Sequence, residues 1–211
     1  MDDSAPKDLR AERHPTGSIR HALAEAANLL DVFRNDADQM ANLDAFVVAA
    51  RHTLEAGGTL LACGNGGSMS QAMHFAEEWT GRFRNTRRAL PALAFSDPTQ
   101  LTCIANDFGF EEVFARQLEA QGRPDDLLLL LSTSGNSENV LRAARVARER
   151  EIRTVALLGH GGGKLGAEVD VPIVVPDATT SDRIQEIHLL ILHSVIEAVE
   201  REWFPANYSM T

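Results

Sequence analysis

The amino-acid sequence predicts an α/β protein, a doubly wound three-layer sandwich built on a five-stranded parallel sheet. Five short apolar runs lack the polar alternation of half-exposed strands, which is typical of strands buried on both faces of a parallel sheet. Helical patterns lie between these runs, so strands and helices alternate along the chain. The expected strands are 59–63, 92–95, 127–131, 154–158 and 171–175, and the expected helices after the first strand are 69–80, 111–121, 138–150 and 182–201.

Two further helices are expected before the first strand. Apolar residues recur at helical spacing from Ile19 to Phe33 and again from Met40 to Leu54, with a break near Asn35. Such added helices are expected to cap the sheet or to pack against another subunit. Residues 1–17 are charged and contain two prolines, and we expect them to form a disordered arm before one domain over 18–204 and a tail over 205–211.

Composition limits the possible partners. The 211 residues suit one α/β domain, and 44% of them are hydrophobic, enough to build a core. The net charge of −10 and the pI of about 5.1 argue against non-specific nucleic-acid binding, which needs a basic face. The two cysteines show no disulfide or CxxC spacing, and no apolar run is long enough to span a bilayer. We therefore expect a cytoplasmic protein without a nucleic-acid or membrane partner.

A glycine-rich turn, Gly64–Ser68, follows the first expected strand and opens a helix. Ligands of open parallel sheets bind outside the carboxyl ends of the strands. Glycines let the backbone approach a ligand, and a helix start offers unpaired N–H groups to an anion. The pattern is neither GxGxxG nor GxxxxGK[ST], so it does not predict NAD or ATP. The alternative is an ordinary tight turn capped by Ser68.

A second polar turn, Ser132–Ser137, follows the third expected strand and also precedes a helix. It holds four hydroxyls and a glycine within six residues, which makes an anion cradle that needs no lysine or arginine. One such hydroxyl would be a helix cap. Four at the end of a strand favour phosphate binding over the cap interpretation.

Candidate acid–base and metal-ligating residues lie on two helices. His74 and Glu78 are four residues apart and share a helix face, so they can hold zinc or another divalent ion, or Glu78 can be a general base. The alternative is a surface glutamate beside a core histidine. On the last helix Gln185 and His193 lie about 12 Å apart along the axis, which favours a site fed by two subunits. His188 lies near the same face and competes with His193.

Four segments in this order, GNGGS, HFAEE, STSGNS and DRIQEIH with a second histidine five residues on, resemble the phosphoheptose isomerases of the SIS domain family. The resemblance runs from about residue 19 to 200 and includes Thr80–Phe83 and Asn106–Gly109. It implies the SIS fold and the aldose–ketose isomerisation of sedoheptulose 7-phosphate to glycero-manno-heptose 7-phosphate through an enediol, the first step toward activated heptose. It also implies a homotetramer with active sites at subunit interfaces and one Zn²⁺ per subunit.

The resemblance assigns roles to residues one by one. Glu78 would be the base and His193 its acid–base partner, with His193 reaching in from a neighbouring subunit. The implied zinc ligands are His74, Glu78, Gln185 and His193. The implied substrate contacts are Asn65, Gly66, Gly67, Glu78, Asn106, Asp107, Ser132, Thr133, Ser134, Ser137 and Gln185, with Arg82 and Asp182 as further candidates.

Two other functions stay open at this point. The chain could isomerise another phosphosugar, such as a hexose or pentose phosphate. A related SIS tetramer binds the bacterial replication initiator protein without isomerase chemistry, but that branch lacks a glutamate at the position matching Glu78. The presence of Glu78 favours the enzyme.

Overall fold

The computed structural model describes residues 16–176 and 180–208, and its centre is a parallel sheet of five strands in the order β2-β1-β3-β4-β5. The central strand β3 pairs with β1 on one side and β4 on the other, which places the end of β1 at Gly64 beside Leu131 of β3. The expected strands are thus confirmed to within one residue at either end. Their bounds are β1 Leu60–Gly64, β2 Ala92–Ala94, β3 Leu127–Ser132, β4 Arg153–Leu158 and β5 Val171–Val174.

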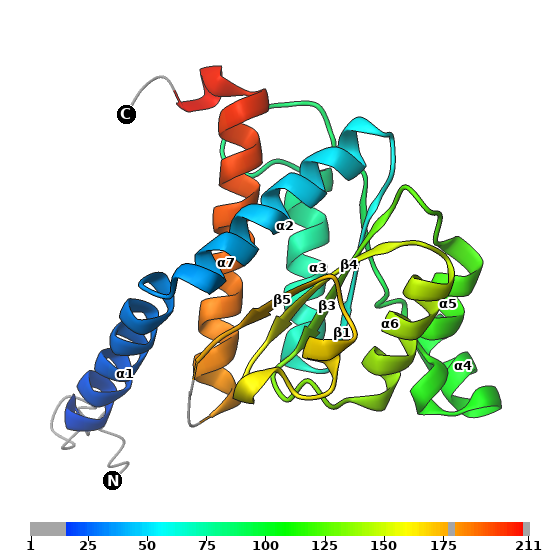
Figure 1. Ribbon diagram of the computed structural model, residues 1–211, viewed down its shortest axis with the longest axis horizontal. Helices are drawn as coiled ribbons and strands as arrows, with labels where there is room; N and C mark the ends of the chain where they lie inside the picture. The colour runs from blue at the N-terminus through cyan, green and yellow to red at the C-terminus, as the bar shows by residue number, and fades with distance from the viewer. Residues whose placement is uncertain (1–15, 177–179, 209–211) are drawn as a thin grey trace, which may run out of the picture.

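Helices cover both faces of this sheet, which confirms the three-layer sandwich (Figure 1). One layer holds α1 Thr16–Arg34, α2 Ala37–Glu55, α3 Gly67–Thr80 and α7 Ser181–Trp203. The other holds α4 Pro98–Phe108, α5 Ala115–Gln121 and α6 Glu138–Glu149. Single turns of 3₁₀ helix complete the chain: η1 Phe110–Glu112, η2 His160–Gly162, η3 Leu165–Ala167 and η4 Pro205–Tyr208. Among the described helices, none combines the length and apolar character that crossing a bilayer requires.

The continuous apolar run of β3 serves two cores at once. Leu127, Leu129 and Leu131 join the cluster under α2, α3 and α7, whereas Leu128 and Leu130 join the cluster under α5 and α6. Successive side chains of a strand point to opposite faces, so each face takes every second leucine. All five are 0% exposed, and burying one such side chain stabilises the fold by about 2 kcal/mol.

The expected helix over 111–121 is partly wrong. The structure has a turn of 3₁₀ helix at η1 and the shorter α5, and it places another helix, α4, before them. Asp97 begins α4 by accepting a hydrogen bond from the backbone N–H of Gln100, and Pro98 occupies the first turn. No residue of α4 is buried, although its apolar residues from Leu101 to Phe108 recur at helical spacing.

The two N-terminal helices meet at the expected break. Asp36 caps α2 by accepting from the N–H groups of Asp38 and Gln39. The helix then covers the edge of the sheet, because Gln39 accepts from the N–H of Val174 and Asn42 donates to the carbonyl of Pro172. Helix α1 begins at Thr16, inside the expected arm, and residues 1–15 lie outside the described part of the chain.

The expected tail over 205–211 is partly structured. Residues 205–208 form η4, which packs against α7, and residues 209–211 lie outside the described part. The Asn85 amide donates to the carbonyl of Asn207, which fastens this turn to the segment after α3.

Candidate active site

The loops after β1 and β3 lie side by side because their strands are neighbours with ends in register. The amides of Asn65 and Asn139 join the loops through two reciprocal hydrogen bonds of 2.9 and 2.8 Å. Asn139 is buried in the first turn of α6, so the glycine turn is fixed to the helix that follows the hydroxyl loop. Asn139 was not among the candidates predicted from the sequence, and its only local signal is its place just after the STSGNS segment.

The hydroxyl loop, residues 132–137, is shaped by its own polar groups. The hydroxyl of Ser132 accepts from the N–H of Gly135, and that of Ser134 accepts from the N–H of Asn136. Thr133 meets Ser181 at 3.1 Å, which connects the loop to the start of α7. Ser137 is the N-cap residue of α6, yet its side chain makes no capping hydrogen bond. The cap interpretation therefore fails at Ser137, and its hydroxyl and the first N–H groups of α6 suit an anion.

The loop after β4, residues 159–165, forms a wall behind the hydroxyl loop. Leu165 donates its N–H to the carbonyl of Gly135, and Lys164 donates its N–H to the side chain of Asn136. Gly135 has a φ of +62°, and a Cβ there would collide with the backbone of Gly162. This wall carried no predicted function, although its four glycines were a signal of close backbone approach.

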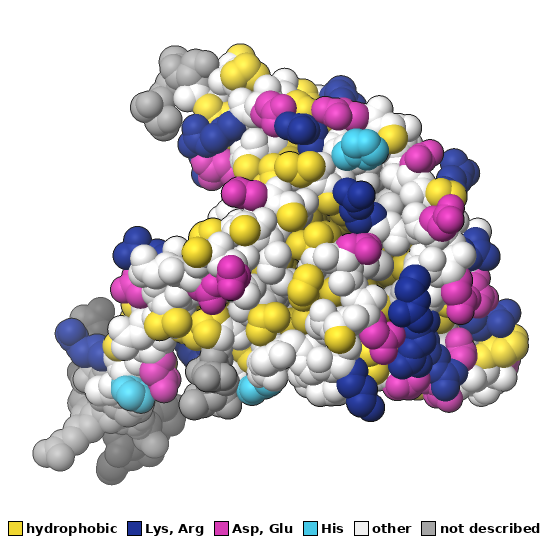
Figure 2. All heavy atoms as spheres, in the orientation of Figure 1, with side chains coloured by type: hydrophobic (Ala, Val, Ile, Leu, Met, Phe, Trp, Pro, Cys, Tyr) yellow, Lys and Arg dark blue, Asp and Glu magenta, His cyan; other side chains and the backbone are white. Residues whose placement is uncertain are grey.

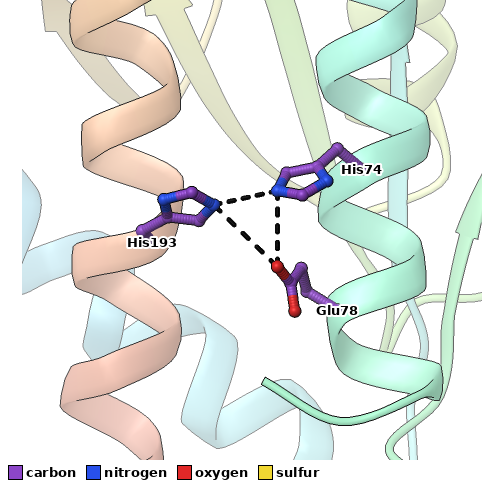
Figure 3. A group of neighbouring side chains, drawn as sticks. All are labelled: His74, Glu78 and His193. Atoms are coloured by element: carbon purple, nitrogen blue, oxygen red, sulfur yellow. Dashed lines mark hydrogen bonds and ion pairs between the residues drawn. The ribbon is translucent and has the colours of Figure 1, made fainter. Parts of the chain in front are cut away.

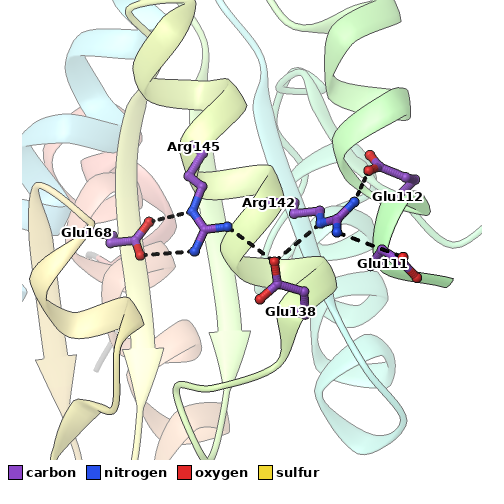
Figure 4. A network of polar contacts seen from close by, with 6 residues as sticks. All are labelled: Glu111, Glu112, Glu138, Arg142, Arg145 and Glu168. Carbon is purple, nitrogen blue, oxygen red and sulfur yellow. Dashed lines mark hydrogen bonds and ion pairs between the residues drawn. The ribbon is translucent and has the colours of Figure 1, made fainter. Parts of the chain in front are cut away.

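The arginines nearest to the hydroxyl loop along the chain are already paired (Figure 4). Arg142 contacts Glu111, Glu112 and Glu138, and Arg145 contacts Glu138 and Glu168 at 3.2 Å each. These carboxylates satisfy both guanidinium groups. Phosphate binding here would rest on hydroxyls and backbone N–H groups, as the sequence predicted.

Three side chains from α3 and α7 converge on one point (Figure 3). The Nε2 atoms of His74 and His193 lie 2.9 Å apart, and Oε1 of Glu78 lies 3.3 Å from the first and 3.9 Å from the second. We call these residues the His–Glu–His cluster. Two imidazole nitrogens and one carboxylate oxygen are the donor set of a zinc site, and all three ligand atoms lie within 4.8 Å of one another.

The surroundings of the cluster tune its members. Glu77 lies 3.1 Å from Nδ1 of His74, which places the proton on Nδ1 and leaves the Nε2 lone pair facing the cluster. Burial first, and then the Glu77 carboxylate, raise the pKa of Glu78 above its ordinary value. Burial and the nearby His74 lower the pKa of His193. Glu77 was not among the candidates predicted from the sequence, although its three-residue spacing from His74 on one helix was an available signal.

The expectation that His193 arrives from a neighbouring subunit is corrected, because one chain brings His193 to His74 and Glu78. The physical reason is the pairing of α3 with α7. These helices run in the same direction, so His193 reaches the level of His74, whereas Gln185 stays near the start of α3. A Cβ on Gly67 would come within 2.6 Å of Gln185 Oε1, which puts this amide about 10 Å along the helix from His74.

The remaining candidates lie elsewhere. Asn106 and Asp107 are exposed on α4, in the opposite helix layer, and Asn106 donates to Asp107 at 2.7 Å. His188 does not compete with His193, because it is fully buried and its Nε2 meets the carbonyl of Leu158 at 3.1 Å. Arg82 is exposed at the end of α3, and Asp182 pairs with Arg183.

Comparison with known proteins identifies the family. Residues 23–159 match the SIS domain family model. A phosphoheptose isomerase of Vibrio cholerae is 46% identical over 184 residues, which cover 87% of this chain and 96% of that protein. A phosphoheptose isomerase of Fusobacterium nucleatum is 54% identical over 152 residues, 72% of this chain and 78% of that protein. This chain belongs to the phosphoheptose isomerases of the SIS domain family.

The three-dimensional comparison agrees with this membership. The structure of the phosphoheptose isomerase GmhA from Neisseria gonorrhoeae superposes with a TM-score of 0.82 at 36% identity. The match covers 88% of this chain and 98% of that one. The family resemblance expected from four short segments is thereby confirmed over most of the chain.

Proposed function

We propose that this protein is a sedoheptulose 7-phosphate isomerase that forms glycero-manno-heptose 7-phosphate, at the start of activated-heptose synthesis. The observation that carries the proposal is the His–Glu–His cluster, in a chain that also has a loop of four hydroxyls after β3 and whose relatives are phosphoheptose isomerases. Aldose–ketose isomerisation needs a base for a carbon proton and a second group that moves protons on the oxygens. The cluster supplies one of each.

The hydroxyl loop holds the phosphate. Ser132, Thr133, Ser134 and Ser137 surround the start of α6, where free N–H groups and the positive end of the helix dipole attract an anion. Asn65, Gly66 and Gly67 approach the sugar from the adjoining turn. Because the phosphate lies far from the reacting carbons, its binding energy orients C1 and C2 at the cluster.

Proton transfer belongs to Glu78 and His193. Glu78 takes the proton from one carbon and returns it to the other, through an enediol. Its raised pKa makes it a stronger base than an exposed glutamate. His193 moves the proton between the two substrate oxygens. Its lowered pKa keeps the imidazole neutral near pH 7, so it can accept a proton as well as donate one.

The cluster also fits a zinc ion. His74, Glu78 and His193 would hold it, and the Glu77 contact to His74 is the hydrogen bond typical of a metal-bound histidine. Gln185, expected as a fourth ligand, has its amide beside Gly67 and is not one of the residues that would hold the ion in this chain. Zinc, when bound, polarises the substrate carbonyl and stabilises negative charge on its oxygen.

A homotetramer would complete the site. Ile19, Leu23 and Val32 are more than half exposed on α1, and Figure 2 shows apolar side chains along this part of the surface. An apolar hollow of about 150 Å³ lies between α1, α2 and α7. Subunit contact through these helices would cover both surfaces. An interface is also the means by which Asn106 and Asp107, in the opposite layer, would reach the substrate of a neighbour.

The test is an isomerase assay with the purified chain. We expect turnover of sedoheptulose 7-phosphate, its loss after chelation, and its recovery with added zinc. Turnover of a hexose or pentose phosphate alone would assign the chain to another phosphosugar. Absence of turnover with all of them would favour the non-catalytic binding function. Light scattering would measure the tetramer, and a monomer at working concentration would contradict the proposed assembly.

A further inference from the structure

A buried ion pair lies beyond the His–Glu–His cluster and joins the segment after α3 to α7. The side chains of Arg87 and Glu200 are both 0% exposed, and Nε of Arg87 lies 2.5 Å from Oε1 of Glu200. Removing two charges from water is costly, and a well-packed apolar pair is often as stable or more stable. Fold stability alone therefore does not explain why charges are kept here.

The other N–H donors of Arg87 bind backbone carbonyls at the end of α3. Its Nη2 donates to the carbonyl of Glu78 at 2.6 Å, and its Nη1 donates to the carbonyl of Trp79 at 2.8 Å. Both belong to the last four carbonyls of α3, which have no partner within the helix. The guanidinium thus fixes the backbone of Glu78 itself.

Glu200 anchors the ion pair to α7. It lies on α7 seven residues after His193, which is two turns along the same helix. Its Oε2 accepts from the hydroxyl of Tyr208 at 3.1 Å. Burial and this contact raise the pKa of Tyr208 to about 12, so the hydroxyl keeps its proton and remains a donor. The turn η4 at the end of the described chain therefore closes over the pair.

We propose that Arg87 and Glu200 are positioning residues for the cluster. They hold the end of α3 at a fixed distance from α7, so that Glu78 and His74 meet His193 at one point. A misplacement of about 1 Å can cost about 10²-fold in rate, which gives the enzyme a reason to keep this pair. The catalytic part of this inference rests on the proposed isomerase function, whereas its metal-binding part does not.

The test replaces the pair by apolar side chains of similar size, Arg87→Met with Glu200→Leu. A matched control is Arg51→Met with Glu202→Leu. Arg51 of α2 lies 2.9 Å from Glu202 of α7, the helix that also carries Glu200. This control pair therefore ties α7 to α2 rather than to α3. Four quantities are measured on each purified protein: the melting temperature, the zinc affinity by chelator competition, and kcat and KM for sedoheptulose 7-phosphate.

For the Arg87/Glu200 variant we expect a melting temperature within about 5 °C of the native protein. Zinc affinity should fall about 10–100-fold and kcat about 10²-fold, with little change in KM. The control should keep the native value of all four quantities. Native zinc affinity and kcat in the Arg87/Glu200 variant, or equal losses in the control, would overturn the proposal.

If the double variant does not fold, Arg87→Lys carries the test. Lysine keeps the charge but cannot serve Glu200 and two carbonyls in the planar geometry of arginine. Reduced zinc affinity in the folded lysine variant supports the proposal, and native affinity overturns it. A native protein that binds zinc but does not turn over sedoheptulose 7-phosphate would refute the proposed function, while the affinity measurements would still decide on the pair.

Discussion

The hydroxyl loop and the His–Glu–His cluster, which we propose as the two ends of one site, are built in opposite ways. The loop draws its groups from six consecutive residues and from backbone N–H groups, and glycines set its shape. The cluster draws side chains from two helices, and its histidines are 119 positions apart in the chain. The comparison teaches that binding and proton transfer can be damaged separately. Changes in the loop should act on KM, whereas changes in the cluster should act on kcat.

The largest expected effect is at the cluster. Glu78→Gln keeps the shape of the side chain but removes the base, so kcat should fall by about 10²–10⁴ with KM nearly unchanged. Steady-state kinetics on sedoheptulose 7-phosphate measures both. Glu119→Gln, at an exposed position of α5, is the matched control and should leave kcat unchanged. A normal kcat for Glu78→Gln would show that Glu78 is not the base. It would also contradict the expectation that changes in the cluster act on kcat and changes in the loop act on KM.

The next effect concerns His188, which lies on α7 between the two ends and contacts β4. Burial lowers its pKa to about 4 from an ordinary value of about 6.5. The unfolded chain therefore binds the proton first as pH falls. The contribution of neutral His188 to the free energy of unfolding is complete above about pH 6.5. It is lost as the pH falls from about 6.5 to about 4, by about 3 kcal/mol in total.

Unfolding by urea across this pH range measures the loss. His188→Gln keeps a donor for the Leu158 carbonyl. In this variant the free energy of unfolding should depend less on pH than it does in the native protein. His52→Gln, at an exposed position of α2, should keep the native slope. Identical slopes in the native protein and the His188 variant would show that this histidine is not held neutral.

A smaller effect is expected where the hydroxyl loop meets its glycine wall. Gly135→Ala should raise KM roughly tenfold, because the left-handed backbone and the collision with Gly162 cost about 1–3 kcal/mol. Gly161→Ala is the matched control. It has a φ of +74° but no atom within 4 Å of the added Cβ, so its KM should stay near native. Zinc affinity should be native in both, and a loss in Gly135→Ala would mean that the two ends are coupled.

The smallest effect tests one hydroxyl. Ser137→Ala should raise KM about fivefold, the value of one hydrogen bond of about 1 kcal/mol, with an unchanged melting temperature. Asp36→Ala offers the opposite case, since Asp36 is a working cap of α2, and it should lower the melting temperature without changing KM. A lowered melting temperature with native KM in Ser137→Ala would restore the cap interpretation.

The sheet was predictable because its strands carry unusually plain signals. The run Leu127–Leu131 is apolar at every position since it serves two cores, and Pro and Gly mark the neighbouring turns. Helix α4 was missed although its apolar residues recur at helical spacing from Leu101 to Phe108 and Asp97 followed by Pro98 marks its start. These local signals were sufficient to predict it.

The candidate site was predictable in its members but not in its assembly. The four-residue spacing of His74 and Glu78 places them on one helix face, and the hydroxyl loop consists of six consecutive residues. The origin of His193 was predicted wrongly because distance along one helix says nothing of where a second helix lies beside it. The buried partners Asn139, Arg87 and Glu200 were missed for the same reason.

By itself the sequence determined the sandwich, the order of its strands along the chain and the polar loops at their ends, because periodicity, turns and consecutive hydroxyls are local properties. Only the tertiary structure decided that α3 and α7 run in parallel contact, with His74, Glu78 and His193 meeting between them and Arg87 fastened to Glu200 beyond. The physical reason is that helix pairing is selected by the packing of the whole apolar layer over the sheet, which no short segment of the chain contains.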